Sequence, residues 1–350
     1  MSYEVDYLPV GGGEKSGDAI ALRFGNLSGT RDEQILIVID GGFKESGEQL
    51  VNHIKQYYQT ERIDVVISTH PDADHASGLF VVLENLEVGH LLMHKPWEHA
   101  ENIKGFFKDN RLTASGLGKK IEKSLQHASD LEDLAIKKGI QIIEPFQGVN
   151  GFNGVMYVLG PSQEYYRGLI SQFKVTPEPI KALDFLAPIQ KITQDAIKWI
   201  NDALHLDLLD DDDDSTSAEN NTSAIILFNI DGHKLLFTGD VGKTGLIQAV
   251  DHAESLGTTL TDLSFFDVPH HGSKRNLSSK ILKRIKTTTS FISASKESPK
   301  HPAKKVTNAL QKHGSKVFVT RGSSLRHHHQ APARNWGPAQ PEPFHDKVED

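Results

Sequence analysis

The sequence predicts a mixed α/β protein in which strands and helices alternate. Short apolar runs rich in β-branched residues are typical of buried strands, and several of them end in glycine or aspartate. Between these runs lie amphipathic stretches whose apolar residues recur at helical spacing. Apolar residues make up 37% of the 350 residues and charged residues 24%, which is typical of a soluble globular protein.

The first 160 residues carry the clearest alternation. The predicted elements there are a strand at 35–40, a helix around 50–58, a strand at 63–69, a helix at 76–86, a strand at 89–93, a helix at 117–138 and a strand at 155–159. The strand pattern resumes at 224–230, where Asp231-Gly232 predicts a tight hairpin turn into a return strand at 233–237. Further predicted elements are strands at 263–268, 291–293 and 317–320 and a helix at 303–313.

We expect one domain over residues 1–330 with an insertion at 163–218. The insertion contains two helical stretches, at 163–173 and 192–206, and an acidic run, and we expect it to be partly disordered around 207–219. A lid beside the functional site is the alternative interpretation of this insertion. The Pro-rich residues 331–350 predict a flexible tail that packs little.

The composition also limits the compartment and the chemistry. The chain has no cysteine, so disulfides and thiolate metal ligands are excluded. It has no apolar stretch long enough to span a bilayer, and its first residues lack the pattern of a signal peptide. We therefore expect a cytoplasmic protein that does not interact with membranes.

Charge is distributed unevenly along the chain. The net charge is −8, but residues 268–330 contain fourteen Lys or Arg against one acid, Glu297. An acidic block at Asp207 and 210–214 opposes this basic stretch. Local charge decides anion binding more than the sum does, so the basic stretch favours a phosphate-containing partner.

The motif His70-Pro71-Asp72-Ala73-Asp74-His75 is the most informative feature. It follows a predicted buried strand directly. Alternate side chains of an extended segment share a face, so His70, Asp72 and Asp74 would converge, with His75 turning in as a helix begins. Imidazoles and carboxylates at this density suit a catalytic Zn, Mn or Fe site, whereas the alternative is an exposed acidic turn.

Similar residues recur at the ends of other predicted strands. Asp40 ends the strand at 35–40, Asp240 follows Thr238-Gly239, and His270-His271 follow the strand at 263–268. Each of these is weak evidence alone. Because layered α/β proteins place their sites at strand ends, the coincidence of four such ends predicts one shared site.

This ordered set of motifs resembles the metallo-β-lactamase superfamily. The likeness is greatest to the hydrolase domain of the DNA-uptake competence channel protein and its free-standing relatives. It rests also on Gly17–Ile20, Asn220–Ser223, Val268–Ser273 and His301-Pro302. The resemblance implies a four-layer αββα sandwich with two metal ions between the sheets.

The resemblance also implies a ligand set. His70 and Asp72 would hold the first ion, and Asp74, His75 and one histidine of the 270/271 pair would hold the second. We favour His270 as that ligand, in which case His271 faces substrate. Asp240 would bridge the two ions, and Asp40 would fix the loop that carries the ligands.

The sequence departs from the superfamily at the first ion. Asp72 stands where most members have histidine, and Asn220–Ser223 replace a further histidine, with Asn221 and Ser223 expected to contact substrate. The site is then richer in oxygen, which shifts its preference from Zn toward Mn. We expect one or two divalent ions.

The predicted activity is hydrolysis of a phosphodiester in DNA or RNA by a metal-bound hydroxide, as in a phosphodiesterase or nuclease. Asp74 would orient the nucleophile, and His301, or else His271, would donate a proton to the leaving group. Lys274 and Arg275 would stand at the rim of the site. The alternatives are a small-molecule hydrolase (lactonase, thioesterase or cyclic-nucleotide phosphodiesterase) or a metal-stabilised, non-catalytic partner subunit. A protein partner or a homo-oligomer is compatible with each of these functions.

Overall fold

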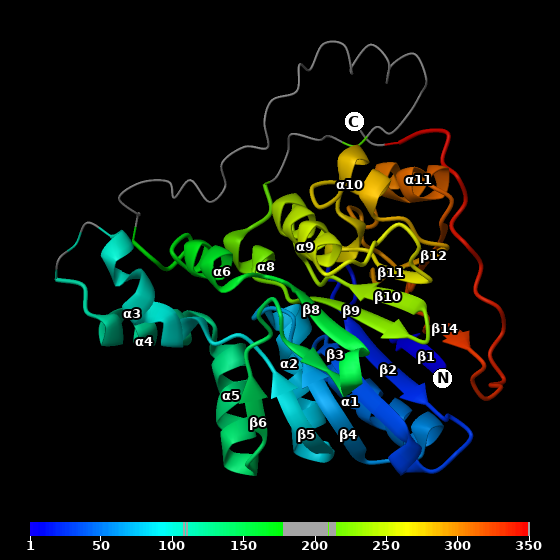
Figure 1. The fold of residues 1–350 in the computed structure, drawn as a ribbon, viewed down its shortest axis with the longest axis horizontal. Coiled ribbons are helices and arrows are strands. Elements are labelled where there is room, and N and C mark those ends of the chain that lie inside the picture. Colours follow the sequence, from blue (N-terminus) through cyan, green and yellow to red (C-terminus); the bar gives the residue numbers. More distant parts are fainter. Residues whose placement is uncertain (108, 110, 178–208, 210–214, 349–350) are drawn as a thin grey trace.

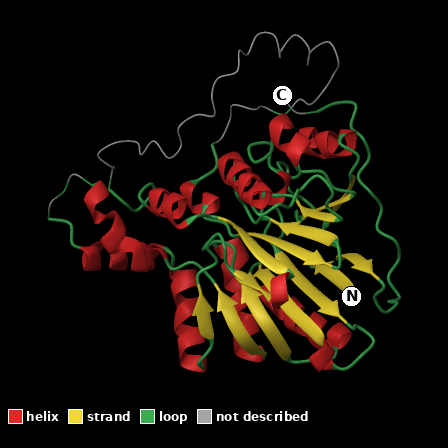
Figure 2. Ribbon diagram, viewed as in Figure 1, coloured by secondary structure: helices red, strands yellow, loops and turns green. Residues whose placement is uncertain are grey.

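The computed structural model describes residues 1–350 except 108, 110, 178–208, 210–214 and 349–350. Two seven-stranded sheets stack face to face, and helices cover the outer face of each sheet (Figures 1 and 2). This arrangement is the four-layer αββα sandwich, so the predicted fold class is confirmed.

Each sheet is half antiparallel and half parallel. The first sheet has the order β14-β1-β2-β3-β4-β5-β6 and the second β13-β12-β11-β10-β9-β8-β7. The strands of the first sheet are β1 (Ser2–Tyr7), β2 (Ala19–Gly25), β3 (Gln34–Gly41), β4 (Arg62–Ile67), β5 (Glu87–Leu92), β6 (Gln141–Ile143) and β14 (Leu325–His329). Those of the second are β7 (Asn150–Gly151), β8 (Met156–Gly160), β9 (Ile225–Ile230), β10 (His233–Phe237), β11 (Phe265–Asp267), β12 (Thr289–Ile292) and β13 (Lys316–Val319).

The described helices form three groups (Figure 1). The first sheet is covered by α1 (Lys44–His53), α2 (Ala73–Asn85) and α5 (Gln126–Lys138). The second is covered by α9 (Lys243–Ser255), α10 (Ser279–Arg284) and α11 (Lys304–Lys312). A side group consists of α3 (Ala100–Ile103), α4 (Ala114–Ser124), α6 (Gln163–Ile170) and α8 (Ala218–Asn221). Short helical turns lie at Arg31–Glu33, Ile54–Tyr58, Pro96–His99, Lys104–Phe106, Phe152–Gly154 and His270–Gly272.

Side-chain alternation along the strands builds the separate cores. In β3, Ile37 and Ile39 point into the space between the sheets, whereas Leu36 and Val38 pack against the helices outside. This is the expected consequence of the two-residue period of a strand that is buried on both faces. The inner core is therefore shared by both sheets and fixes their relative position.

Strand direction gathers several chain segments at one edge of the sandwich. β3 and β4 are parallel, so both end there, and β2 begins there because it pairs antiparallel with β3, with Ala19 opposite Gly41. Helix α2 approaches this edge closely, since a Cβ at Gly78 would lie 1.9 Å from the carbonyl oxygen of Gly41. Only glycine permits that approach, which brings the first turn of α2 beneath the end of β3.

The structure corrects the prediction of one helix at 117–138. The chain forms α4 and α5 instead, and it turns at Leu125, whose φ and ψ are −115° and 44°. Leu117 and Ile121 of α4 pack into the core of the side group, whereas Leu131 of α5 packs onto the first sheet. The periodicity continues through the break because each half has its own apolar surface to cover.

The C-terminal segment differs from the expected loosely packed tail. Residues 325–329 form β14, which pairs with β1, and the following segment continues alongside the second sheet toward α11 (Figure 1). The side chain of Arg334 is only 6% exposed and forms ion pairs with Glu4 and Asp6. Glu342 donates its N–H to the carbonyl of Val317.

Parts of the predicted insertion lie outside the described residues. The helix expected at 192–206 and the acidic run at 210–214 belong to that part. Of the insertion, helix α6 is described, and it packs against α8 and α3 in the side group. Among the described residues, no helix is long and apolar enough to cross a membrane.

Candidate metal centre

The loop after β4 carries the predicted ligands, and Asp40 holds it in place. Asp40 ends β3 with a positive φ of 53°, which for a non-glycine residue is a strained conformation. Its carboxylate accepts hydrogen bonds from the backbone N–H of Thr69 (2.8 Å), the hydroxyl of Thr69 (2.6 Å) and Nδ1 of His75 (2.8 Å). One buried carboxylate therefore fixes the loop and the following helix together.

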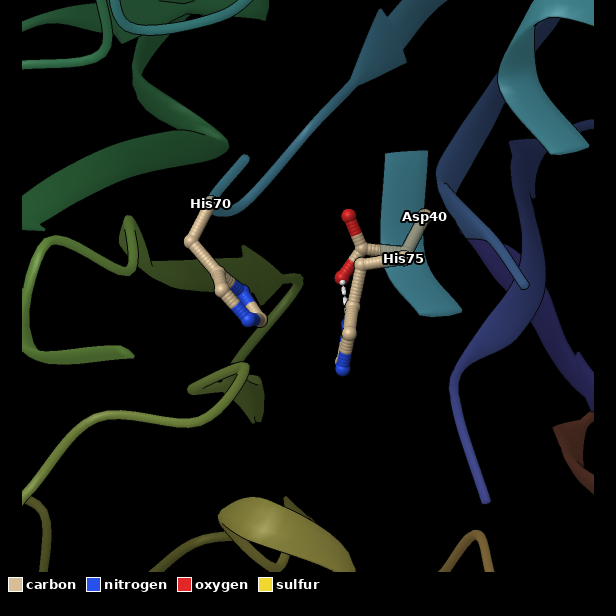
Figure 3. Close-up of side chains that lie close together, drawn as sticks. All are labelled: Asp40, His70 and His75. Carbon is tan, nitrogen blue, oxygen red and sulfur yellow. Dashed lines mark hydrogen bonds and ion pairs between the residues drawn. The ribbon is translucent and has the colours of Figure 1, made fainter. Parts of the chain in front are cut away.

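These hydrogen bonds also determine which histidine nitrogens remain available. The single hydroxyl proton of Thr69 goes to Asp40, so its oxygen accepts from Nδ1 of His70 at 3.0 Å. Nδ1 of His75 donates to Asp40. The Nε2 atoms of both rings are buried and have no hydrogen-bond partner, and Figure 3 shows the two rings directed into the same space. In both histidines Nδ1 therefore carries the proton, and the unprotonated Nε2 can bind a metal ion.

Asp240 lies at the centre of this space. Its carboxylate oxygens are 3.4 Å from Nε2 of His75, 3.7 Å from that of His270, 3.9 Å from that of His70 and 4.0 Å from that of His271. Burial alone would raise the pKa of Asp240, but the surrounding imidazoles outweigh it and hold the pKa well below its usual range. Four imidazoles and one carboxylate therefore converge on a common volume.

The loop after β10 holds Asp240 in this position. The backbone N–H of Asp240 donates to the hydroxyl of Ser223 (3.0 Å), and Asn220 donates its side-chain amide to the carboxylate (3.2 Å). The amide of Asn276 donates to the backbone carbonyls of Asp240 (3.1 Å) and Val241 (2.9 Å). All three of these supporting side chains are buried.

The histidine pair after β11 has unusual backbone geometry. His270, His271 and Gly272 all have positive φ, at 51°, 55° and 77°. Two consecutive non-glycine residues in this region store strain, and such strain clusters at functional sites. Because the Asn276 amide donates to backbone, its oxygen accepts from Nδ1 of His270 at 3.2 Å, which leaves Nε2 of His270 available.

The structure brings His271, rather than His270, together with Asp74 and His75. Ligand atoms of Asp74, His75 and His271 lie within 4.8 Å of one another, as do those of two further groups, Asp40 with His70 and His75, and Asp18 with His75 and Asp240. The side chain of His270 is 29% exposed, whereas that of His271 is 6% exposed. Burial lowers the pKa of His271 to about 4, and neither ring nitrogen has a hydrogen-bond partner.

An open cleft of about 340 Å³ gives access to this cluster. Asp74, His270, His271 and His301 form its inner wall. The ring of His301 stacks on that of His270 with centroids 5.8 Å apart. Burial lowers the pKa of His301 to about 4, so its ring is neutral at pH 7 and lacks the extra proton that the expected proton donor needs.

Five predicted site residues lie outside the cluster of converging ligand atoms. Asp72 precedes α2 as its N-cap, is half-buried, and lies outside the described groups of converging ligand atoms. Asn221 and Ser223 are buried, and their side chains are bonded to the protein's own backbone, so neither side chain is directed at substrate. Lys274 and Arg275 are exposed on the loop that follows His271.

Asp18 is a site residue that the sequence prediction missed. It is 4% exposed, and its carboxylate oxygens lie 3.7 Å from Nδ1 of His75 and 3.7 Å from Nδ1 of His271. Burial raises the pKa of Asp18 well above its usual range. Asp18 precedes β2, whereas the predicted ligands follow strands. The antiparallel pairing of β2 with β3 brings the start of β2 beside the end of β3, and this places Asp18 at the site.

The sequence matches a known family over most of its length. The family model of the metallo-beta-lactamase superfamily matches residues 30–296. No curated protein sequence matches the chain. Among solved structures, one described as a candidate metallo-beta-lactamase from Thermotoga maritima is 12% identical, with a TM-score of 0.36 over 73% of this chain and 93% of that one.

A second solved structure, a long form RNase Z from yeast, is 13% identical to this chain. Its TM-score is 0.41 over 93% of this chain and 42% of that one, so the chain spans less than half of the yeast protein. At such low similarity, neither structure bears on the activity of this chain.

Proposed function

Because this chain belongs to the metallo-beta-lactamase superfamily, we propose that it is a metal-dependent hydrolase of phosphodiesters that acts as a nuclease on DNA or RNA. Within the superfamily we assign it to the branch of the DNA-uptake hydrolase domain, on its set of motifs. The observation that supports the proposal most strongly is the convergence of four imidazole Nε2 atoms on the carboxylate of Asp240.

The donor set fits divalent metal ions. Nε2 of His70, Nε2 of His75, both nitrogens of His271 and one oxygen of Asp240 are buried without a hydrogen-bond partner. Leaving so many buried polar atoms unpaired is costly, whereas cations among them would satisfy Nε2 of His70, Nε2 of His75, one nitrogen of His271 and the Asp240 oxygen. The carboxylates of Asp240 and Asp40 also outweigh burial and raise the pKa of His75 well above its usual range, so this position favours positive charge.

We assign the residues to two ions. Asp74, His75 and His271 would hold one ion, and His70 would hold the other together with Asp240. Asp72 remains a weaker candidate for the His70 side because its carboxylate lies outside the converging groups. Imidazole and carboxylate donors without thiolate suit Zn or Mn.

When bound, such ions supply Lewis-acid polarisation of a phosphate and lower the pKa of an attacking water. The protein's own residues then orient the substrate. Asp74, whose side chain is 32% exposed at the cleft, accepts a hydrogen bond from the nucleophile and aligns it. His301 is neutral at pH 7 and contacts the substrate as a hydrogen-bonding group on the same wall.

Positive charge near the cleft supports a phosphate substrate over a neutral ester. Lys15 lines the cleft, and Lys274 and Arg275 are exposed only a few residues after His271. Cations at such a rim compensate the charge of phosphate groups and attract polyanions from solution. This distribution favours a nuclease over a lactonase or thioesterase.

A substrate panel tests the proposal. Protein loaded with Mn or Zn is incubated with a chromogenic phosphodiester, single-stranded and duplex DNA, RNA, a lactone and a thioester. We expect cleavage of the phosphodiesters, abolished in the double variant His75→Ala with Asp240→Asn and retained in His90→Ala, which removes an exposed histidine outside the cluster. Cleavage of the lactone or thioester alone would contradict the proposal.

A further inference from the structure

The cleft continues into a second groove. This side groove has a volume of about 650 Å³ and runs past Gly11, Gly12, Glu45 and Gln49. Lys15 and Phe43 line both the cleft and the side groove, so the two cavities meet at this pair. A substrate that extends from the metal centre past this pair would enter the side groove.

The junction combines one cation with one aromatic ring. Nζ of Lys15 lies 5.8 Å from the centroid of the Phe43 ring, and Lys15 forms no ion pair with any residue that the structure describes. The Phe43 ring is partly exposed. An ammonium beside a partly exposed aromatic ring is suited to bind a nucleotide, because the phosphate needs a cation and the base needs a stacking surface.

Both side chains are carried by backbone that is firmly held. The loop around Lys15 is bonded to the end of β12, because Ser295 donates to the carbonyl of Gly13 (2.5 Å) and Ser293 donates to that of Gly17 (2.5 Å). The carbonyl of Phe43 accepts from the first turn of α1, from Ser46 N–H and Gly47 N–H at 3.0 Å each. Fixed backbone on both sides makes the junction a preformed binding surface.

We propose that the side groove binds the part of a single-stranded nucleic acid that flanks the scissile phosphate, with a base on Phe43 and one phosphate on Lys15. The inference rests on the proposed function and extends it from a phosphodiester to a polymer. Glu45 also lines the side groove, so further phosphates are repelled there and bases occupy the remaining surface. A duplex is excluded because its bases are already stacked and paired.

Binding measurements test whether the side groove binds single-stranded nucleic acid, without relying on turnover. Metal-free protein is titrated into labelled single-stranded DNA and RNA of about twelve nucleotides and into a duplex, with anisotropy as the readout. We expect Phe43→Ala to weaken single-strand binding about tenfold and Phe43→Trp to restore it. Lys15→Ala should reduce the slope of log affinity against log salt by about 0.7, the value for one phosphate on a single strand.

Two further variants serve as matched controls. Lys44→Ala removes an exposed lysine beside Phe43 that lines neither cavity, and its affinity and salt slope should equal those of the unmodified protein. Glu45→Gln removes a negative charge from the groove and should tighten binding. Equal affinity for duplex and single strand, or unchanged affinity in both Phe43→Ala and Lys15→Ala, would overturn the proposal.

Cleavage assays distinguish an error in the proposed binding by the side groove from an error in the proposed function. With an oligonucleotide and a small chromogenic diester compared, Lys15→Ala and Phe43→Ala should lower kcat/KM for the oligonucleotide about tenfold more than for the diester. Equal losses of kcat/KM on both substrates would refute binding by the side groove but not the proposed function. If the two variants weaken nucleic-acid binding but the unmodified protein cleaves no phosphodiester, the proposed function is refuted and binding by the side groove is not.

Discussion

Three hydrogen bonds from Thr69 and His75 converge on the carboxylate of Asp40. It therefore acts on the metal centre through the residues that it orients. Carboxylates in this position fix the ring orientation of a ligating histidine and increase its basicity. The strand-end position of Asp40 predicted only that it belongs to the site, and the family resemblance implied that it fixes the ligand loop.

The first prediction concerns this carboxylate. Asp40→Asn replaces an acceptor oxygen with an amide that faces donors, so the ligand loop loses its support. We expect metal affinity to fall about 10- to 100-fold, measured by competition with a chromogenic chelator. The control is Asp32→Asn, which removes an exposed carboxylate bonded to Arg62. An affinity equal to that of the control would contradict the role assigned to Asp40.

A second prediction distinguishes the two adjacent histidines. His271→Ala should lower metal affinity more than His270→Ala, because His271 is buried and lies with Asp74 and His75. The same chelator competition decides the question. A larger loss of metal affinity in His270→Ala would instead support His270 as the ligand, as the sequence predicts.

At the scale of elements, the segment after β14 is held by a buried charge network. Arg334 pairs with Glu4 and Asp6 of β1, both fully buried, and its guanidinium lies over the rings of Tyr57 and Trp336. Removing one partner from such a network leaves buried charge uncompensated. The tail therefore contributes to the stability of the first sheet.

The third prediction follows from this network. Arg334→Ala should lower the free energy of unfolding at pH 7 by about 3–5 kcal/mol, measured by urea denaturation. Arg321→Ala is the control from the same region, because its pair with Glu342 is 42% exposed on the arginine side and should contribute less than about 1 kcal/mol. Equal effects of the two variants would show that the network is not buried in solution.

The network should also respond to acid. Burial alone would raise the pKa of Asp6, but His53, Arg334 and Tyr58 outweigh it and lower the pKa. A carboxyl group with a lowered folded pKa stabilises the fold fully above its unfolded value of about 3.9, and this stabilisation is lost as pH falls through the folded pKa. The stability gap between the unmodified protein and Arg334→Ala should therefore narrow below about pH 4. A constant gap down to pH 2 would contradict this assignment.

At the scale of the whole molecule, the metal centre joins the two sheets. His70 and His75 follow β4 of the first sheet, whereas Asp240 and His271 follow β10 and β11 of the second. Ions bound by both sets would connect the layers across the inner core. Metal binding should then stabilise the complete sandwich.

The fourth prediction concerns this coupling. A metal present at about one hundred times its dissociation constant should add about 2.7 kcal/mol to the stability. Chelation should therefore lower the Tm by several degrees, and the shift should disappear in His75→Ala. A Tm that is the same with and without chelator would show that the sheets are not coupled through metal.

Local sequence patterns indicated the alternation of strands and helices and part of the site, whereas the four-layer arrangement was implied by the family resemblance. Buried strands give continuous apolar runs, so β3, β4 and β9 were predictable, and polar residues at or after the ends of β3, β4 and β10 indicated Asp40, His70 and Asp240. The contributions of Asp18 and Asn276 depend on strand pairing and loop folding that join distant segments. Single-sequence periodicity carries no information about such contacts, which is also why the anchoring of Arg334 was missed.

Metal content tests the central claim most directly. The protein is purified without chelator, and Zn, Mn and Fe are quantified per chain beside the double variant His75→Ala with Asp240→Asn. We expect about one to two ions per chain in the unmodified protein and almost none in a double variant that remains folded by circular dichroism. Equal metal content in the two proteins, or a folded and active protein without metal, would contradict the assignment of a metal centre around Asp240.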